Sequence, residues 1–375
     1  MHLVWVIRRF YPLLLGGTEI RMKQVAEVLI PRGYKVTVLT RRLEANLAAH
    51  ENVSGIEIHR FPPADLLFQL GVKKWVKDNH RSIDLIHTFR FDKLGMVGAW
   101  CQRQYRIPHV ADIITNEFKN MLQNKKRKVE KIIKGAALIH CLNQHTVNLL
   151  KQVGAPDSKI WYRPNAVDTD LFYPADSVEP EEKVTFLFCG RFDNQKGVDF
   201  LIASWKRVPR DLRAKARLVL VGSGEREGEF RQLATGEPEI IFAGQVEREA
   251  MPDCYRQAQV YIQPSKFEGM SNAILEALAS GLPVITTKVE GNADLVTPGY
   301  NGLLVAYGDI DGLANAVITL LQEPELRRQM GLNSRKLAET RYSMSALFDD
   351  YQRMYDLIRE MNDSCGENMP ERIHS

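Results

Sequence analysis

The sequence lacks the features typical of membrane-spanning, disulfide-bonded and zinc-binding proteins. No apolar run approaches the roughly 18 residues that a membrane-spanning helix needs. The 5 cysteines among 375 residues are far apart and form no CxxC pair, so no disulfide framework or zinc site is indicated and a cytoplasmic protein is expected. Low-complexity tracts are absent too, and the 26% of charged residues is ordinary for a globular protein. In the opening segment MHLVWVIRRF the charges follow the apolar stretch, which favours a first strand over a secretory signal.

Charged residues, by contrast, are plentiful, and the two signs are unevenly distributed along the chain. Residues 1–170 carry 27 Lys and Arg against 15 Asp and Glu, a net charge of +12, whereas the remainder carries a net charge of −8. A basic half can serve a phosphate ligand, a nucleic acid or an anionic membrane.

Short apolar runs rich in β-branched residues alternate with helical patterns along most of the chain, which predicts a parallel α/β architecture. The segment 162–183 interrupts this rhythm with three prolines and a run of acids. We therefore predict two Rossmann-like, doubly wound domains facing a central cleft. The expected parts are a first domain at 1–165, a second domain at 166–342, a terminal helix at 343–362 that packs back towards the first domain, and a flexible tail at 363–375.

Two turns between a strand and a helix are candidates for binding phosphate. Gly16 and Gly17 of LLLGGTEI let the backbone approach a ligand closely at a helix N-terminus, where an anion is favoured. In FCGRFDNQKGVDF, Gly190 follows a strand, and Arg191 and Lys196 flank the turn. Two cations at a helix N-terminus suit a diphosphate, although a solvated surface loop would have the same sequence.

Two nucleotide-binding motifs are not supported. The turns lack the GxxxxGK[ST] spacing of a P-loop, so ATP hydrolysis is not indicated. VLVGSGE, with Gly222, resembles half of a GxGxxG turn but lacks the later glycine, which weakens an interpretation as an NAD site.

The stretch SKFEGMSNAILEALASGLPVITT places Glu268 in a loop before a helix and Glu276 within that helix. Ser271 is a good N-cap, so the N–H groups of 269–272 are expected at the same crevice as both carboxylates. Carboxylates accept sugar hydroxyls, while N–H groups and the helix dipole favour phosphate. The arrangement suits a nucleotide sugar, whereas the alternative interpretation makes Glu276 a surface helix residue.

These motifs resemble those of the retaining glycosyltransferases of family four (glycosyl transferases group 1), which adopt the GT-B fold. The Glu-x7-Glu spacing resembles the signature of that family, and PNAVDTDLF, GRFDNQKG, VGSGE and GNADLV…NGLLV resemble its other blocks in the same order. The match is specific across roughly 160–305, and GGTE fits in the first half. The resemblance implies transfer of a sugar from a UDP- or GDP-sugar to a glycan, lipid-linked or small-molecule acceptor. It also implies that 1–165 binds the acceptor and 166–342 the nucleotide sugar. Polysaccharide or glycolipid biosynthesis is the implied setting.

The resemblance also implies roles for single residues. Arg191 and Lys196 would hold the diphosphate, with Gly17 closing from the other domain, and no metal or other cofactor would be required. Glu276 would bind the ribose and Glu268 the transferred sugar. The remaining donor-site residues implied are Gly16, Gly190, Gly222, Gly269, Met270, Ser271 and Asn272.

One position departs from the family pattern. Many relatives carry a histidine after the strand that here reads PHVADII, where it contacts the donor sugar. Asp112 is a candidate substitute, and His87 a second candidate that is equally consistent with a satisfied residue at a strand end. The DTD at 168–170 lies in the interdomain block, so we expect a structural role for it rather than metal binding.

Two other functions fit the same motifs. One is a GT-B epimerase acting on a nucleotide sugar, and the other is a non-catalytic protein that binds such a sugar; intact Arg191, Lys196, Glu268 and Glu276 argue against the second. No nucleic-acid partner is expected. A further hypothesis concerns 118–136, a basic amphipathic segment that would lie on the cytoplasmic face of an anionic membrane. The alternative is that its apolar side packs into the domain.

Overall fold

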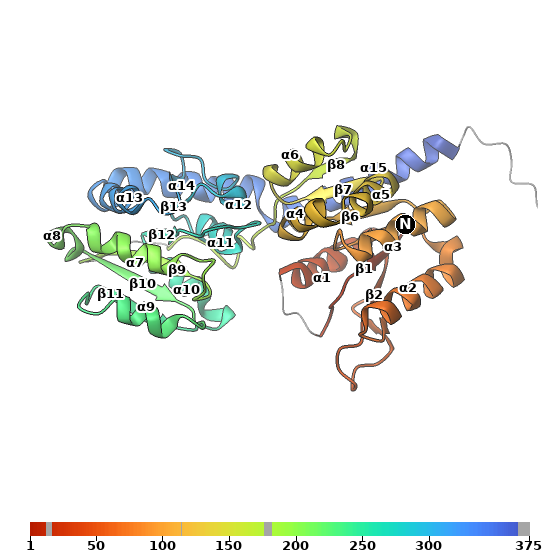
Figure 1. The fold of residues 1–375 in the computed structure, drawn as a ribbon, viewed down its shortest axis with the longest axis horizontal. Coiled ribbons are helices and arrows are strands. Elements are labelled where there is room, and N and C mark those ends of the chain that lie inside the picture. Colours follow the sequence, from red (N-terminus) through yellow and green to blue (C-terminus); the bar gives the residue numbers. More distant parts are fainter. Residues whose placement is uncertain (13–16, 114, 176–181, 367–375) are drawn as a thin grey trace, which may run out of the picture. The chain divides into compact units, whose positions relative to one another are not determined.

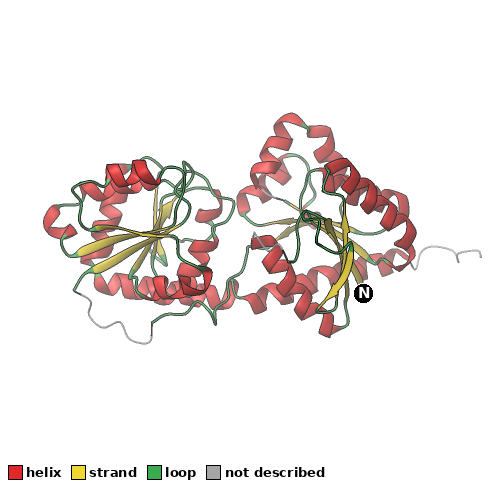
Figure 2. Ribbon diagram, turned by 90° about the horizontal axis from the view of Figure 1, so that it is seen from below, coloured by secondary structure: helices red, strands yellow, loops and turns green. Residues whose placement is uncertain are grey.

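The computed structural model describes residues 1–12, 17–113, 115–175 and 182–366. The chain forms two compact units: unit 1 comprises Met1–Arg163 and Phe348–Ser375, and unit 2 comprises Pro164–Leu347. The division falls two residues before the boundary at 165 that the sequence indicates. Each unit is an α/β layer structure with helices on both faces of a mostly parallel sheet (Figures 1 and 2).

Unit 1 contains an eight-stranded sheet in the order β3-β4-β2-β1-β5-β6-β7-β8, in which only the β3–β4 pair is antiparallel among the described pairings. The strands are β1 (His2–Val6), β2 (Lys35–Arg41), β3 (His50–Val53), β4 (Ile56–Phe61), β5 (Leu85–Thr88), β6 (His109–Asp112), β7 (Leu138–Cys141) and β8 (Ile160–Tyr162). The helices are α1 (Gly17–Leu29), α2 (Asp65–Asn79), α3 (Lys93–Tyr105), α4 (Thr115–Asn124), α5 (Lys126–Gly135) and α6 (Gln144–Gln152), with 3-10 turns η1 (Ile30–Arg32), η2 (His80–Ser82) and η3 (Asp157–Lys159).

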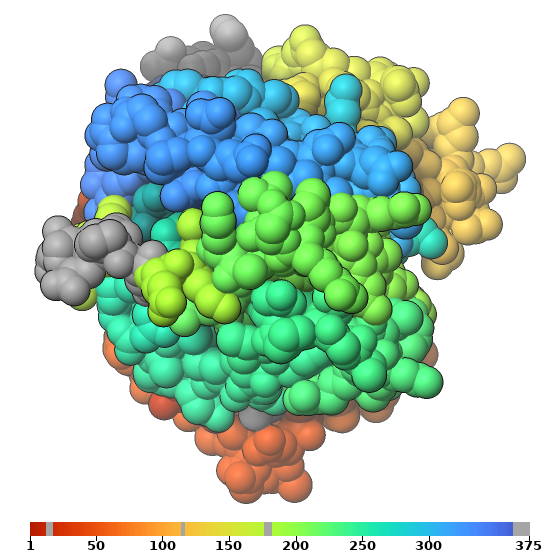
Figure 3. Space-filling model, turned by 90° about the vertical axis from the view of Figure 1, so that its left-hand side faces the viewer, coloured from red at the N-terminus to blue at the C-terminus, as the bar shows by residue number. Residues whose placement is uncertain are grey.

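Unit 2 contains a six-stranded sheet in the order β11-β10-β9-β12-β13-β14, and its described pairings are parallel. The strands are β9 (Val184–Cys189), β10 (Ala216–Val221), β11 (Ile240–Gly244), β12 (Val260–Gln263), β13 (Val284–Thr287) and β14 (Gly302–Val305). The helices are α7 (Val198–Arg207), α8 (Arg210–Arg213), α9 (Glu227–Leu233), α10 (Met251–Arg256), α11 (Asn272–Ala279), α12 (Glu290–Ala293), α13 (Ile310–Gln322) and α14 (Pro324–Arg341), with η4 (Arg248–Ala250). Figure 3 shows the outer surface of this unit, where α13 and α14 (blue) lie above α7 (green).

The central strands β9 and β12 of unit 2 are mostly apolar and almost entirely buried because helices cover both faces of the sheet. Phe186 and Phe188 of β9 face a core that includes Trp205 of α7, whereas Leu187 of the same strand faces the core under α11. Such alternation within one apolar run gives the sheet two separate cores. The strand order reverses between β9 and β12, so the carboxyl ends of these two strands form a topological switch point, where ligands of such sheets bind.

Helix α15 (Met344–Gly366) begins in unit 2 and contributes most of its length to unit 1. Tyr351 and Tyr355 are buried there against His87 of β5. The helix extends beyond the predicted end at Asn362, and 367–375 lie outside the described residues.

The basic segment 118–136 differs from the expected single helix. It forms parts of α4 and α5, which are separated at Lys125. Phe118, Val129 and Ile132 are buried in the core of unit 1, so the apolar side of this segment packs inward and is not available to a bilayer. Within the described residues, no helix combines the length and hydropathy that crossing a membrane requires.

Candidate functional site

The loop after β9 and the loop after β12 meet at the switch point of unit 2. Lys266 N–H donates to the carbonyl of Gln195 over 2.8 Å, and the Gln195 side chain donates to the carbonyl of Phe267 over 3.0 Å. Gly197 has a φ of 70°, and a Cβ at this position would lie 2.2 Å from the carbonyl oxygen of Pro264. Glycine is therefore required both for the left-handed backbone and for the close approach of the two loops.

Lys196 and Glu268 form the centre of the site. The Lys196 Nζ lies 2.6 Å from Oε1 of Glu268, and the two side chains are 15% and 7% exposed. The same oxygen accepts hydrogen bonds from the side chains of Gln263 and Ser265, each over 3.1 Å. Because three donors converge on Oε1, the carboxylate is fixed in orientation while Oε2 has no recorded partner among the described residues.

Glu276 lies on α11, one turn after the N-cap. Ser271 caps this helix through its hydroxyl, which accepts from Ile274 N–H over 3.3 Å. The Tyr255 hydroxyl donates to Oε2 of Glu276 over 2.9 Å, and burial raises the pKa of Glu276. The first N–H groups of α11 have no partner within the helix and are suited to an anion. The helix thus presents a carboxylate and an anion-binding end at one edge of the sheet.

Arg191 differs from Lys196 in its surroundings. Its side chain is 71% exposed and forms an ion pair with Asp193 over 3.1 Å. Asp193 also accepts from the N–H groups of Gln195 and Lys196, so it shapes the turn that presents both cations. The structure therefore brings Lys196 to the buried centre of the site and leaves Arg191 at its solvent-exposed margin.

Three of the predicted donor-site residues have a structural contact that requires no ligand. Gly222 has a φ of 138°, and a Cβ there would lie 1.9 Å from the carbonyl oxygen of Gly190. Met270 and Asn272 contact the predicted interdomain block: the sulfur of Met270 accepts from Asn165 N–H over 3.1 Å, and the Asn165 side chain donates to that of Asn272 over 3.0 Å.

In that block, Asp168 accepts from the N–H groups of Asp170 and Leu171. The DTD sequence therefore shapes a turn, as expected.

The two predicted sugar contacts in unit 1, Asp112 and His87, belong to a buried hydrogen-bond network. Oδ1 of Asp112 accepts from His87 Nε2 and His140 Nδ1, each over 2.7 Å, and Oδ2 lies 3.6 Å from Arg21. The other ring nitrogens pair with the Tyr355 hydroxyl and with the carbonyl of Arg163.

The two histidines and the aspartate could hold a metal by position, but hydrogen bonds account for all four ring nitrogens. His87 is thus a satisfied residue at a strand end, and the role of Asp112 as a sugar contact stays a prediction. Gly17 begins α1, and Gly16 lies outside the described residues.

Sequence reasoning missed four residues that shape the site. Gln263 and Ser265 orient Glu268, and Tyr255 holds Glu276. Gly291 N–H donates to the carbonyl of Glu268 over 3.2 Å, and a Cβ on Gly291 would lie 2.1 Å from the carbonyl oxygen of Gly269. Gly291 and Ser265 carried a signal, because they belong to the quoted GNADLV and SKFEGMSN stretches; Gln263 and Tyr255 carried none.

Comparisons with known proteins agree with this geometry. Residues 15–171 match the family model described as Glycosyltransferase Family 4, and residues 183–323 match the model described as Glycosyl transferases group 1. A GDP-mannose-dependent monoacylated alpha-(1-6)-phosphatidylinositol monomannoside mannosyltransferase of Corynebacterium glutamicum is 26% identical over 90% of this chain and 93% of its own.

Solved structures with the same fold include two with high coverage. The sucrose-phosphate synthase of Thermosynechococcus elongatus has a TM-score of 0.79 at 23% identity, covering 97% of this chain and 99% of that one. Anabaena Alr3699/HepE in complex with UDP has a TM-score of 0.75 at 19% identity, covering 95% of this chain and 100% of that one. With both halves matched by family models, the chain belongs to the glycosyltransferases of family four and has the GT-B fold.

Proposed function

We propose that the chain is a retaining glycosyltransferase that moves a sugar from a UDP- or GDP-sugar to an acceptor. The observation that carries the proposal is the Lys196–Glu268 pair at the switch point, with the N-terminus of α11 and Glu276 beside it. A leaving diphosphate needs positive charge, a sugar needs oriented acceptors, and a ribose needs a carboxylate. The relative named above uses GDP-mannose and HepE was solved with UDP, which supports either nucleotide.

The residues divide this chemistry as follows. Lys196 and the dipole of α11 stabilise the charge that develops on the diphosphate, and in this proposal they act in place of a divalent cation. Glu268 accepts a hydroxyl of the transferred sugar at Oε2, since Oε1 is held by three donors. Glu276 accepts ribose hydroxyls through the oxygen that Tyr255 does not occupy.

The test is incubation of the purified chain with a panel of UDP- and GDP-sugars, followed by NMR of the products. Slow donor hydrolysis that releases the sugar with the donor's anomeric configuration is expected for a retaining transferase. Interconversion of the sugar on its nucleotide would instead indicate an epimerase. Binding of a nucleotide sugar without any turnover, even with mixed acceptors, would contradict an enzymatic role.

We also propose that the acceptor is lipid-linked and that unit 1 contacts an anionic membrane, through α2 rather than through 118–136. Leu66, Leu67 and Leu70 of α2 are 66%, 51% and 54% exposed. At 100° per residue these leucines share one side of the helix with the exposed Lys74 and Lys77. Exposed leucines beside lysines are typical of a surface that lies at a bilayer interface.

A cavity of about 590 Å³ lies between α2, α3 and the α4–α5 pair. Its lining carries six lysines and arginines, among them Lys73 with Trp100 beneath it, against three aspartates and glutamates, so the cavity has a net positive charge. This lining suits an acceptor that carries phosphate. The mannosyltransferase relative is named for a phosphatidylinositol acceptor, which supports the same class.

Co-sedimentation with phosphatidylglycerol vesicles tests the membrane proposal. The wild type is expected to bind at low salt, and substitution of Leu66, Leu67 and Leu70 by Gln is expected to abolish binding. A matched variant with Lys125, Lys126 and Lys128 changed to Gln should lose only part of it, because each lysine near the surface contributes about 1 kcal/mol. Equal binding by the leucine variant and the wild type would contradict the assignment to α2.

A further inference from the structure

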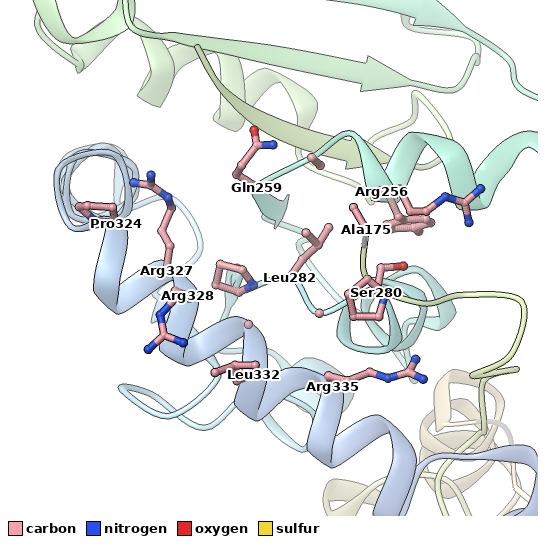
Figure 4. Close-up of a pocket in the computed structure, with 16 residues that line it drawn as sticks. Ala175, Arg256, Gln259, Ser280, Leu282, Pro324, Arg327, Arg328, Leu332 and Arg335 are labelled. Atoms are coloured by element: carbon pink, nitrogen blue, oxygen red, sulfur yellow. The ribbon is translucent and has the colours of Figure 1, made fainter. Parts of the chain in front are cut away.

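A second cavity, of about 340 Å³, lies in unit 2 at the opposite edge of the sheet from the candidate donor site. Ala258 and Gln259 of its lining precede β12, and Leu282 and Pro283 precede β13. The Glu268 loop, by contrast, follows the carboxyl end of β12. Figure 4 shows Ser280 and Leu282 inside the cavity, with α14 along one side. The cavity is therefore separate from the donor site.

The charged side chains that line this cavity are all positive. Four arginines contribute to its lining, and no aspartate or glutamate does so among the described residues. Three of the four have acidic partners elsewhere: Arg256 with Asp253, Arg328 with Glu325 and Arg335 with Glu339.

Arg327 is the exception. It is half-buried and forms no ion pair with a described carboxylate, while Nη1 donates to the carbonyls of Leu320 and Leu321. These carbonyls hold the guanidinium in place and leave its charge available to a ligand.

The rest of the lining is mostly apolar, with neutral polar side chains at Ser280 and Gln259. Leu282 forms part of the interior, and Leu332 at the rim is 53% exposed although it is a leucine. Ser280 is buried, and its hydroxyl has no hydrogen-bond partner among the residues that the structure describes. Gln259 uses its side-chain oxygen to accept from Thr185 N–H over 2.7 Å, which leaves its amide N–H groups as donors. Small-molecule sites have this combination of an apolar interior and a few oriented polar groups, and this size.

We propose that this cavity is a binding site for a small amphipathic anion, with a compact apolar body against Leu282 and Leu332 and one phosphate or carboxylate group at Arg327. Ser280 and Gln259 supply neutral donors to the same molecule. Arginine pairs with phosphate and carboxylate in bidentate geometry, so either head group satisfies the site.

Tyr255 connects this cavity to the donor site. Tyr255 contributes to the cavity lining, and its hydroxyl donates to Glu276 over 2.9 Å and to the carbonyl of Ala273 over 3.2 Å. Helix α11 runs from Ser271 at the donor site to Ser280 at the cavity. A bound molecule thus acts on the residue that positions Glu276, and the site is an effector site for nucleotide binding. This coupling rests on the proposed function, whereas the binding itself does not.

Calorimetric titration with octyl phosphate, octanoate and octanol, each below its micelle concentration, tests the binding. The full-length chain is expected to bind both anions and to bind octanol at least roughly tenfold more weakly. Arg327→Gln should weaken the binding of both anions by a similar factor. Arg327→Lys retains the charge but loses the bidentate geometry, so its affinity for the anions should lie between those of the wild type and Arg327→Gln. Leu332→Gln should lower the affinity for all three compounds.

The matched control is Arg207→Gln. Arg207 is an exposed arginine of unit 2, paired with Asp311, that does not line the cavity, and this variant should bind octyl phosphate like the wild type. Failure of the wild type to bind either anion overturns the proposal. Equal affinity for octanol, or unchanged affinity in Arg327→Gln with a native circular-dichroism spectrum, also overturns it.

Coupling is measured by titrating UDP and GDP with and without saturating octyl phosphate. A change of roughly threefold or more in nucleotide affinity is expected, and Tyr255→Phe should remove it while octyl phosphate still binds, because the link is the hydroxyl. Nucleotide binding that is insensitive to octyl phosphate overturns the effector role. Absence of nucleotide binding with octyl phosphate still bound contradicts the proposed function and leaves the cavity proposal standing.

Discussion

Unit 1 and unit 2 each place carboxylates at the carboxyl edge of a parallel sheet, and the surroundings of those carboxylates differ. Asp112 in unit 1 has both oxygens engaged by His87, His140 and Arg21 beneath α15. Glu268 and Glu276 in unit 2 each use one oxygen within the protein and keep the other without a recorded partner among the described residues. The same fold thus uses buried carboxylates as structural centres in one unit and leaves them ready for a ligand in the other.

The largest expected effect concerns catalysis in unit 2. Lys196→Ala should lower kcat by roughly 10²–10³-fold, because it removes a preorganised charge at the leaving group. Arg191→Ala should lower kcat by a smaller factor, since Arg191 is exposed and paired with Asp193. Steady-state kinetics with the best donor of the panel measures both, and Lys196→Arg serves as the control that keeps the charge. Wild-type turnover in Lys196→Ala would remove the lysine from the mechanism.

The next effect concerns stability in unit 1. Asp112→Asn should lower the free energy of unfolding by about 3 kcal/mol, since it removes the charge from a buried network that contains Arg21. Glu276→Gln is the same chemical change in unit 2, where one partner and partial exposure predict a cost below about 1.5 kcal/mol. Urea denaturation compares the two variants. Equal costs would show that the two carboxylates are not in different environments.

Nucleotide affinity should separate the two glutamates of unit 2. Glu276→Gln is expected to lower the affinity for UDP or GDP roughly tenfold, because a charged acceptor for the ribose hydroxyls is lost. Glu268→Gln should leave that affinity unchanged or raise it, since Lys196 is released from its ion pair, while transfer to an acceptor falls. Calorimetry and turnover assays on each variant decide the matter; similar losses of affinity in both would mean that their roles are wrongly assigned.

The smallest effect is the contribution of buried histidines to the pH dependence of stability, which arises in unit 1. Sequence positions 164–347 contain no histidine, whereas burial lowers the pKa of His87 and lowers that of His109 to about 3. Both histidines therefore bind protons at a higher pH in the unfolded chain than in the folded one, so stability falls as the pH drops through the ordinary value of 6.5. The expected slope is at most about 1.4 kcal/mol per histidine per pH unit.

Urea denaturation at pH 7.5 and 5.5 checks this slope. Substitution of His109 by Asn should reduce this slope by the contribution of one histidine. Asp168→Asn in unit 2 is the control and should leave the slope unchanged. A slope that His109→Asn does not alter would contradict the assignment.

Most strands of both units could be predicted because buried parallel strands are short runs dominated by apolar and β-branched residues, as in VTFLFC. The two strands that escaped prediction lack that signal. β3 reads HENV and pairs only with β4 at the edge of the sheet, and β8 is three residues long. The interruption at Lys125 was hidden because lysines and arginines favour helix on either side of it.

The site was predictable in its local part only. Spacing within SKFEGMSNAILE places Glu268 before a helix and Glu276 inside it. The contacts between Lys196 and Glu268 and between Tyr255 and Glu276 join residues 72 and 21 positions apart. Such contacts depend on which loops and helices pack together, which periodicity does not report. The separation between a buried Lys196 and an exposed Arg191 likewise follows from the path of the turn.

The path of α15 has a consequence for dissecting this protein into fragments. Unit 1 is discontinuous in sequence, because Tyr351, Met354 and Tyr355 fill its interior from a helix that follows unit 2. A fragment ending at Arg163 would expose the surface that these side chains cover and leave His87 without its tyrosine partner. Unit 1 is therefore a candidate for fragment complementation, in which a synthetic peptide of residues 344–366 restores the fold of residues 1–163, or for circular permutation that makes its two segments continuous.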